Sequence, residues 1–200
     1  MDNHLKTISY YDQNAENFVG TTAGVDFHEV QDRFLNYVPA GGRILDFGCG
    51  SGRDTKYFLE KGYQVEACDG SEEMCKRASA YTGIDVKKMM FSELNAKNVY
   101  DGIWACASIL HLPKKELHSV ILKMIQATKI DGYIYMSFKY GDFEGEQRGR
   151  YFTHFTEKSF ASFTQDIFGM TVMEEWVSED VRPGRENEKW LNLIVRNERA

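Results

Sequence analysis

The chain lacks the residue patterns that usually indicate a metal site or a disulfide framework. The chain has four cysteines, Cys49, Cys68, Cys75 and Cys106, and they form no C-x-x-C pair. Three of the four fall within segments that we expect to be buried. The five histidines include no pair at the spacing that places two ligands on one helix face. We therefore expect reduced thiols, no disulfide bond and no bound metal.

Long apolar runs and basic runs are also missing. No segment approaches the roughly 20 apolar residues of a membrane-spanning helix, and the N-terminus lacks the apolar centre of a signal peptide. The net charge of −6 comes without a run of lysine and arginine that would attract a phosphate backbone. We expect a cytoplasmic protein that binds neither membrane nor nucleic acid.

What the chain does contain is an apolar segment, 43–47, followed by a glycine-rich turn. The segment has the character of a buried strand, and three alternate glycines follow it, Gly48, Gly50 and Gly52. Glycines allow a tight turn whose backbone N–H groups approach a ligand closely. A helix that begins near Arg53 would point its positive N-terminal end into the same space. The pattern predicts a strand, a ligand-binding turn and a helix.

Two details of this turn distinguish the ligands that such a unit binds. The dinucleotide fingerprint Gly-x-Gly-x-x-Gly fails, because its third glycine would fall at Arg53. The carboxylate of Asp46 would also disfavour a pyrophosphate. Asp46 and the glycines resemble motif I of the class I S-adenosylmethionine (SAM) methyltransferases, whose ligand carries an ammonium and a sulfonium but no phosphate. The turn alone leaves a dinucleotide site or a chance glycine loop open.

A second strand signal covers 63–68 and ends on Asp69. Ser71 then caps a helix that carries two acidic residues in its first turn, where the helix dipole favours them. In nucleoside-binding βαβ units, an acid about 20 residues beyond the glycine turn accepts hydrogen bonds from the ribose hydroxyls. Asp69 lies at that range, so it supports an adenosine ligand. The alternative is an ordinary strand-end aspartate in an Asp-Gly turn.

A third segment, 100–113, begins as a buried strand and leads into an amphipathic helix, with Pro113 at its start. It resembles motif IV of the same methyltransferases, and 90–94 ends a strand where that family contacts adenine. The arginine after the glycines also resembles the tellurite-resistance type, and the whole domain is similar to ubiquinone-biosynthesis methyltransferases. The resemblance implies that SAM is the cofactor and S-adenosylhomocysteine (SAH) the product. It implies cofactor contacts at Tyr11, Asp46, Gly48, Cys49, Gly50, Gly52, Arg53, Asp69, Gly70, Ser71, Met74, Phe91, Ser92, Ala105 and Ser108.

Helix and strand patterns alternate along one domain, residues 1–200. Helices are predicted near 8–19, 26–37, 53–61, 72–81, 114–128 and 157–167. Strands are predicted near 43–47, 63–68, 85–90, 100–106, 133–139, 170–177 and 190–196. This alternation predicts an α/β, Rossmann-like three-layer sandwich around a mostly parallel seven-stranded sheet. The short loop at 182–185 favours a hairpin, so the last strand should be antiparallel.

Three further segments are candidates for chemistry and acceptor binding. His111 is the candidate general base, since it leaves the motif IV strand beside the methyl donor; otherwise it forms a local hydrogen bond that shapes the turn. An irregular stretch within 140–154 should cover the acceptor pocket, and the helix near 8–19 is either a lid over SAM or a packing helix. Candidate acceptor contacts, with a solvated loop as the alternative, are Lys139, Arg150 and Tyr151.

The function predicted from these segments is methyl transfer from SAM to a small-molecule acceptor. A non-catalytic SAM-binding module is the main alternative. A nucleic-acid methyltransferase is a weaker one, because the chain lacks both the Asp/Asn-Pro-Pro-Tyr sequence and a Pro-Cys nucleophile. The acceptor atom stays open among oxygen, nitrogen, sulfur and a chalcogen, and so does the choice between monomer and homodimer.

Overall fold

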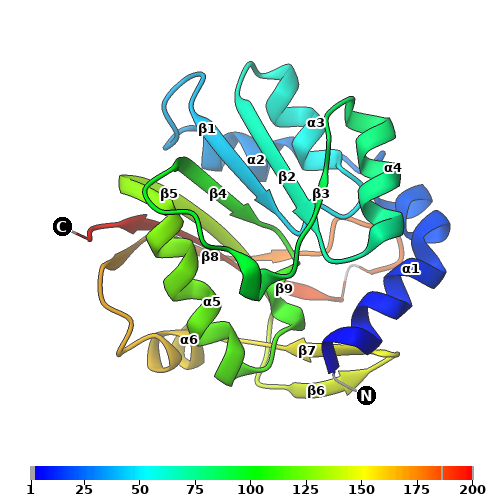
Figure 1. Ribbon diagram of the computed structural model, residues 1–200. Helices are drawn as coiled ribbons and strands as arrows, with labels where there is room; N and C mark the ends of the chain where they lie inside the picture. Colours follow the sequence, from blue (N-terminus) through cyan, green and yellow to red (C-terminus); the bar gives the residue numbers. More distant parts are fainter. Residues whose placement is uncertain (1–2, 186, 200) are drawn as a thin grey trace.

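A twisted seven-stranded sheet runs through the middle of the protein, with helices on both faces (Figure 1). The computed structural model describes residues 3–185 and 187–199. The strand order is β3-β2-β1-β4-β5-β9-β8. The strands are β1 (Arg43–Phe47), β2 (Gln64–Asp69), β3 (Lys87–Lys88), β4 (Tyr100–Ala105), β5 (Thr128–Lys139), β8 (Met170–Glu179) and β9 (Lys189–Asn197).

Strands β1 to β5 are parallel, whereas β9 pairs antiparallel with both β5 and β8. The predicted sheet and its C-terminal hairpin are therefore confirmed. The chain moves outward to β2 and β3 on one side of β1, then returns to β4 on the other side. This reversal opens a crevice beyond the carboxyl ends of β1 and β4, which is where ligands bind in sheets of this kind.

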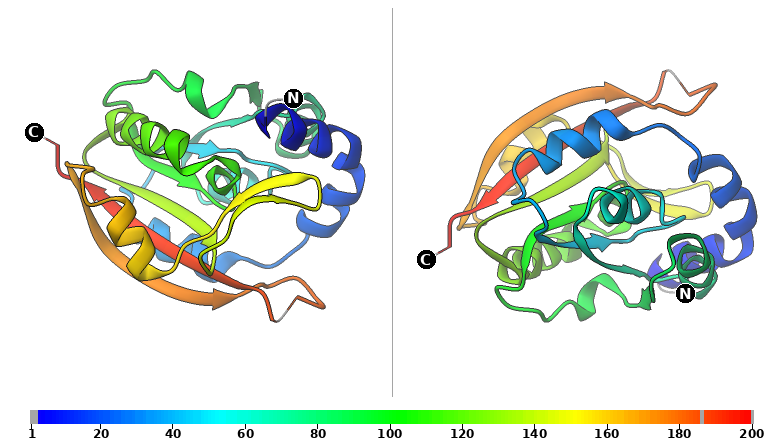
Figure 2. Two further views of the ribbon diagram at one scale, coloured as in Figure 1. Left: turned by 90° about the horizontal axis from the view of Figure 1, so that it is seen from below. Right: turned by 90° about the horizontal axis from the view of Figure 1, so that it is seen from above.

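All six predicted helices are present: α1 (Asn3–Thr22), α2 (His28–Leu35), α3 (Arg53–Glu60), α4 (Glu72–Thr82), α5 (Lys114–Ala127) and α6 (Glu157–Phe163). Two 3-10 turns, η1 (Phe91–Glu93) and η2 (Ile109–His111), follow β3 and β4. Buried side chains of α2 and α3 pack on one face of the sheet and those of α5 and α6 on the other (Figure 2). No helix in the described part of the chain is long and apolar enough to cross a membrane.

The prediction of an irregular stretch between residues 142 and 150 is wrong. Strands β6 (Glu144–Gln147) and β7 (Arg150–Thr153) form a separate antiparallel hairpin there. Its two-residue loop is Arg148-Gly149, and both residues have positive φ, 52° and 77°, as a type I′ hairpin turn requires. The strand pattern was hidden because β6 is almost entirely polar, so it shows no alternation of apolar residues.

Aromatic side chains hold α2 and α3 on the sheet. Phe34 of α2 is fully buried, and its ring lies 5.2 Å from that of Trp104 on β4. Trp104 in turn stacks on Tyr135 of β5 at 4.0 Å. Gly102 leaves room for this packing, since a Cβ there would come within 2.7 Å of the Phe34 ring. The same contacts support the end of β4, where the motif IV turn begins.

We expect Phe34→Ala to destabilise the protein by about 3–5 kcal/mol, because it removes a fully buried ring and leaves a cavity. Urea unfolding followed by circular dichroism measures this change. The matched control is Phe168→Ala, since the Phe168 side chain is 82% exposed and its removal should leave the free energy of unfolding nearly unchanged. Equal effects of the two substitutions would contradict the packing described here.

Candidate active site

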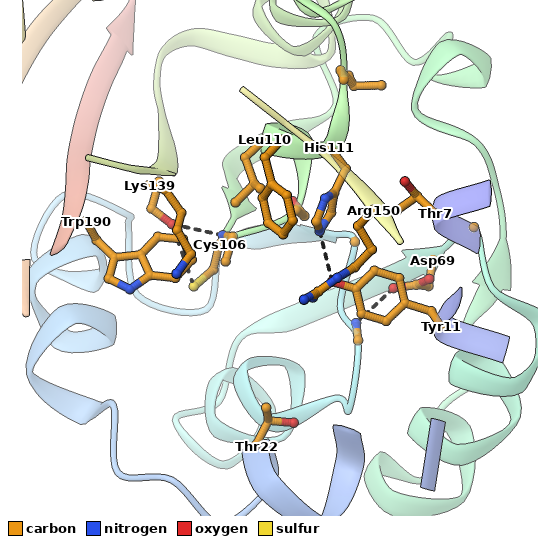
Figure 3. Close-up of a pocket in the computed structure, with 18 of the residues that line it drawn as sticks. Thr7, Tyr11, Thr22, Asp69, Cys106, Leu110, His111, Lys139, Arg150 and Trp190 are labelled. Atoms are coloured by element: carbon orange, nitrogen blue, oxygen red, sulfur yellow. Dashed lines mark hydrogen bonds between the residues drawn. The ribbon is translucent and has the colours of Figure 1, made fainter. Parts of the chain in front are cut away.

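A cavity of about 980 Å³ lies beyond the carboxyl ends of the parallel strands (Figure 3). Its wall combines α1, the glycine turn after β1, the ends of β2 and β4, the β6–β7 hairpin and the loop between β8 and β9. A concave site of this size, with apolar walls and a few polar groups, suits a small organic ligand. The cavity is long, and its two ends differ in charge.

The glycine turn forms one side of this cavity. Gly48, Gly50 and Gly52 all have positive φ, and a Cβ on Gly48 would lie only 2.5 Å from Cβ of Ser108. The N–H groups of Gly48 and Cys49 both donate to the carbonyl of Cys68 at 2.9 Å. The N–H group of Gly50 donates to Asp69. These N–H groups therefore stabilise the turn itself. Because glycine has no Cβ, a ligand can still approach the backbone of the turn closely.

Asp69 joins the glycine turn to the start of α4. Its two carboxylate oxygens accept hydrogen bonds from the backbone N–H groups of Gly50 at 3.0 Å and Ser71 at 2.9 Å. Burial raises the pKa of this carboxyl, and the two donors oppose that rise. Asp69 lines the cavity, so its remaining lone pairs are available to hydroxyl groups of a ligand.

Asp46 lies behind the turn and does not line the cavity. It is 2% exposed and accepts a hydrogen bond from the hydroxyl of Thr55 at 2.6 Å. Burial and the nearby carboxylate of Asp54 raise the pKa of Asp46 to about 8. Asp46 therefore supports the turn from behind, through its hydrogen bond with Thr55, rather than contacting a ligand at the cavity surface.

Asp54 is a lining carboxylate that the sequence patterns did not single out. It accepts hydrogen bonds from Gln31 at 2.6 Å and from the indole of Trp104 at 2.8 Å. It also binds both Nε and a terminal nitrogen of Arg53, at 2.7 and 3.0 Å. The Arg53 guanidinium lies 4.4 Å from the ring centre of Phe27. Arg53 lines the cavity, and its two hydrogen bonds to Asp54 fix the orientation of the guanidinium.

His111 lies at the centre of a hydrogen-bond chain that joins three separate segments. Its Nδ1 is 2.7 Å from the carbonyl oxygen of Tyr151, which can only accept, so Nδ1 carries the hydrogen. Its Nε2 is 2.9 Å from the hydroxyl of Tyr11 on α1, and Arg150 donates to that hydroxyl at 3.2 Å. Burial lowers the pKa of His111 to about 4, so the ring is neutral near pH 7 and Nε2 is an acceptor.

Helix α1 lines one side of the cavity and is anchored to two neighbouring elements. Figure 2 shows α1 beside α4 at the edge of the molecule. On the α4 side, Asp12 accepts a hydrogen bond from the hydroxyl of Ser71 at 2.6 Å. On the hairpin side, Thr7 accepts from the N–H group of Tyr151 at 3.1 Å. Beyond Asp12, toward the C-terminal end of the helix, the ring of Phe18 lies over Gly50. The helix begins earlier and ends later than the predicted 8–19.

The structure brings most of the predicted site residues to one cavity. The cavity wall does not include Asp46, Gly52, Ala105 and Tyr151. The Tyr151 side chain instead bonds to Glu144 on the hairpin, and only its backbone contributes, by holding His111 and Thr7. The lining residues that the sequence patterns missed include Phe27, Asp54, Arg182, Arg185 and Trp190.

Comparison with known proteins finds a methyltransferase domain within this chain. The model of the methyltransferase domain family matches residues 44–132. An uncharacterized methyltransferase of Staphylococcus carnosus is 25% identical over 155 residues, 73% of this chain and 74% of that protein. The probable SAM-dependent methyltransferase TehB of Haemophilus influenzae is 27% identical over 97 residues, 46% of this chain but 34% of TehB.

A solved structure shares the fold. It is the 1,6-didemethyltoxoflavin-N1-methyltransferase of Burkholderia thailandensis with bound 1,6-didemethyltoxoflavin and SAH, at a TM-score of 0.77 and 21% identity. The match covers 96% of this chain and 87% of that one. The chain is a class I SAM-dependent methyltransferase.

The near half of the cavity fits the charge of the methyltransferase's cofactor. We define this half by the lining residues between 4 and 120. Its acids, Asp54, Asp69 and Glu116, outnumber its bases, Arg53 and Lys115, and Asp46 adds a carboxyl behind the wall. An excess of carboxyl groups favours a ligand with ammonium and sulfonium groups and disfavours a pyrophosphate.

We expect Asp69→Asn to weaken SAH binding about 10- to 100-fold in isothermal titration calorimetry. Hydrogen bonds to a charged group contribute about 1.5–3 kcal/mol, and the amide would turn an NH₂ group toward one of the two backbone donors. The matched control is Asp85→Asn, because Asp85 is exposed and lies outside the cavity wall. Unchanged SAH affinity in Asp69→Asn would exclude Asp69 from the cofactor site.

Proposed function

We propose that this methyltransferase transfers the methyl group of SAM to a small-molecule acceptor, with His111 as general base and Tyr11 as its partner. The observation that carries the proposal is the neutral imidazole at the end of β4, whose Nε2 is an acceptor and whose tautomer is held by the Tyr151 carbonyl. The ring is unprotonated over the whole physiological pH range, which a general base requires.

The near half of the cavity supplies the proposed cofactor contacts. Asp69 would accept hydrogen bonds from the ribose hydroxyls of SAM, and Phe91 and Ser92 would flank its adenine. Arg53 would bind the carboxylate of the methionine part of SAM. The remaining proposed contacts on the cavity wall are Tyr11, Gly48, Cys49, Gly50, Gly70, Ser71, Met74 and Ser108, and the other three predicted residues, Asp46, Gly52 and Ala105, would support the site from outside that wall. SAM, when bound, supplies a methyl group on a positively charged sulfur, which a nucleophile in line with that bond can take directly.

The protein's own contribution to the reaction is alignment and proton removal. Holding the reactants in line lowers the barrier by roughly 7–11 kcal/mol, so few catalytic groups are needed. Burial raises the pKa of Tyr11, so its hydroxyl keeps its proton and donates to Nε2 of His111. A proton lost by the acceptor can reach Nε2 directly or through this hydroxyl, while Arg150 holds the hydroxyl in place.

The enclosure of the cavity supports the small-molecule class. Helix α1 and the β6–β7 hairpin both line the cavity and bond to each other, so together they cover part of it, which favours a small acceptor over a polymer. We further propose a single domain in which α1 is a lid and residues 140–154 cover the acceptor. A cytoplasmic location, no nucleic-acid partner and a monomer or homodimer complete the proposal.

We expect His111→Ala to lower kcat about 10²- to 10⁴-fold while SAH affinity stays unchanged, because the base acts on the acceptor and not on the cofactor. The assay incubates the protein with methyl-labelled SAM and a metabolite extract, then follows the label into an isolated acceptor. Tyr11→Phe should lower kcat less, since it removes only the hydroxyl. The control is His118→Ala, whose ring pairs with Asp166 at 3.3 Å outside the cavity wall.

The pH profile gives an independent check on His111. Only the neutral ring is a base, and with a pKa near 4 it is neutral throughout the range from pH 5 to 8. The activity should therefore show no step at the usual histidine pKa near 6.5 and should decline only as the pH approaches 4. Labelled SAM that binds but transfers to no metabolite would instead indicate a binding module.

We expect SAM to protect the backbone of residues 10–18 from hydrogen exchange. Tyr11 and Phe18 line the cavity, so a bound ligand would hold α1 closed against the hairpin and α4. Mass spectrometry of the free and SAM-bound protein measures this effect, with α6 (Glu157–Phe163) as the internal control. Equal exchange in 10–18 in both states would exclude a lid role for α1.

A further inference from the structure

The far half of the cavity is basic, in contrast to the near half, where acids outnumber bases. We define the far half by the lining residues between 137 and 192. Among its described residues, six bases (Lys139, Arg148, Arg150, Arg182, Arg185 and Lys189) accompany three acids (Glu179, Asp180 and Glu188). Figure 3 shows Lys139 and Trp190 on the opposite side of the cavity from Asp69, with Arg150 between the two sides.

The carboxylates of this half are already engaged by a subset of the bases. Asp180 is buried and accepts hydrogen bonds from Arg182 at 2.8 Å and from the indole of Trp190 at 3.1 Å. Glu188 pairs with Lys139, and its other oxygen lies 3.8 Å from Arg185. Arg148 and Arg150 have no carboxylate within ion-pair distance in the described residues. Positive charge is thus left over after the ion pairs are formed.

The bases also lie close enough to disturb one another. Burial first, and then the guanidiniums of Arg182, Arg185 and Arg150, lower the pKa of Lys139 to about 8. Burial and Arg182 likewise lower the pKa of Arg185. Neighbouring positive charges repel one another, and this repulsion destabilises the cluster unless an anion lies between them. The arrangement is therefore complementary to a negatively charged group.

Two hydrogen-bonding atoms in the same wall have no partner within the protein. Nε of Arg150, which can only donate, and Nε2 of His154, which donates or accepts according to the tautomer, are both buried and have no hydrogen-bond partner among the described residues. Both residues line the cavity. Buried polar atoms are nearly always paired, so an unpaired donor beside a cavity indicates a ligand that carries acceptors. An oxyanion supplies several acceptor oxygens at once.

We infer that the methyl acceptor carries an oxyanion, a phosphate or a carboxylate, which binds in the far half between Arg150 and Arg185, two lining bases without a close carboxylate partner in the described residues, beside Lys139. Arg150 would hold the acceptor at the junction of the two halves, beside Tyr11 and His111. Asp180 acts as a positioning residue, since it orients both Arg182 and the Trp190 indole. The inference rests on the proposed function, because it assigns the charge of that reaction's acceptor.

The test is calorimetric titration of the SAH-saturated protein with inorganic phosphate and, separately, with sodium acetate, at constant ionic strength. We expect saturable binding of at least one of them. Tighter binding of phosphate indicates a phosphate-bearing acceptor, and tighter binding of acetate a carboxylate-bearing one. Titration with choline chloride should show no binding, because its charge has the wrong sign. If neither anion binds, the inference is overturned.

Arg185→Gln is the informative variant, because among the described residues its side chain is paired only through a long contact of 3.8 Å to Glu188. We expect it to weaken anion binding about tenfold, the usual effect of losing one charge-assisted hydrogen bond, without changing SAH affinity. The matched control is Arg196→Gln on β9, outside the cavity wall. Equal losses in both variants would overturn the inference by showing a non-specific effect of net charge.

SAH affinity and anion affinity are measured separately, so failure of this inference can be distinguished from failure of the proposed function. Failure of SAH to bind the wild-type protein would contradict the cofactor site itself, whichever anion bound. Normal SAH binding without anion binding would contradict only the charge of the acceptor. Lys139→Met provides a second variant from a different strand, and it should weaken the same anion while SAH affinity is retained.

Discussion

The structure of the site depends on one chain of hydrogen bonds, which runs from Arg150 through Tyr11 and His111 to the carbonyl of Tyr151. It connects the first helix, the turn after β4 and the hairpin strand β7, which are far apart in the sequence. Burial makes each bond important, because a polar group left unpaired there is costly. The same chain holds α1 over the cavity and orients the only imidazole nitrogen proposed to take a proton.

Charge is divided along the cavity in a way that suits a reaction between a cation and an anion. Carboxyl groups gather around the glycine turn, and bases gather between β5, the hairpin and the β8–β9 loop. A cationic methyl donor and an anionic acceptor would each be attracted to its own end. Their reacting parts would then meet near His111, at the point where the two regions of potential adjoin.

Much of the fold could be predicted from local sequence patterns. The seven strands of the main sheet and all six helices follow from apolar periodicity, the glycine turn and the helix cap at Ser71. The hairpin at 144–153 was missed because β6 has polar side chains and is stabilised by its pairing with β7 alone. Asp54 was missed because its neighbours Gln31 and Trp104 come close only in the folded chain.

The sequence by itself determined the donor side of this protein, because Asp46, the three glycines, Arg53 and Asp69 lie within one βαβ unit whose geometry is local. Tertiary structure decided the acceptor side. Arg182, Arg185 and Trp190 come from the β8–β9 hairpin, and only the insertion of β9 between β5 and β8 brings them to Lys139. Contacts between distant segments leave no periodicity in the chain, so the charge of the acceptor pocket became visible only in the folded protein.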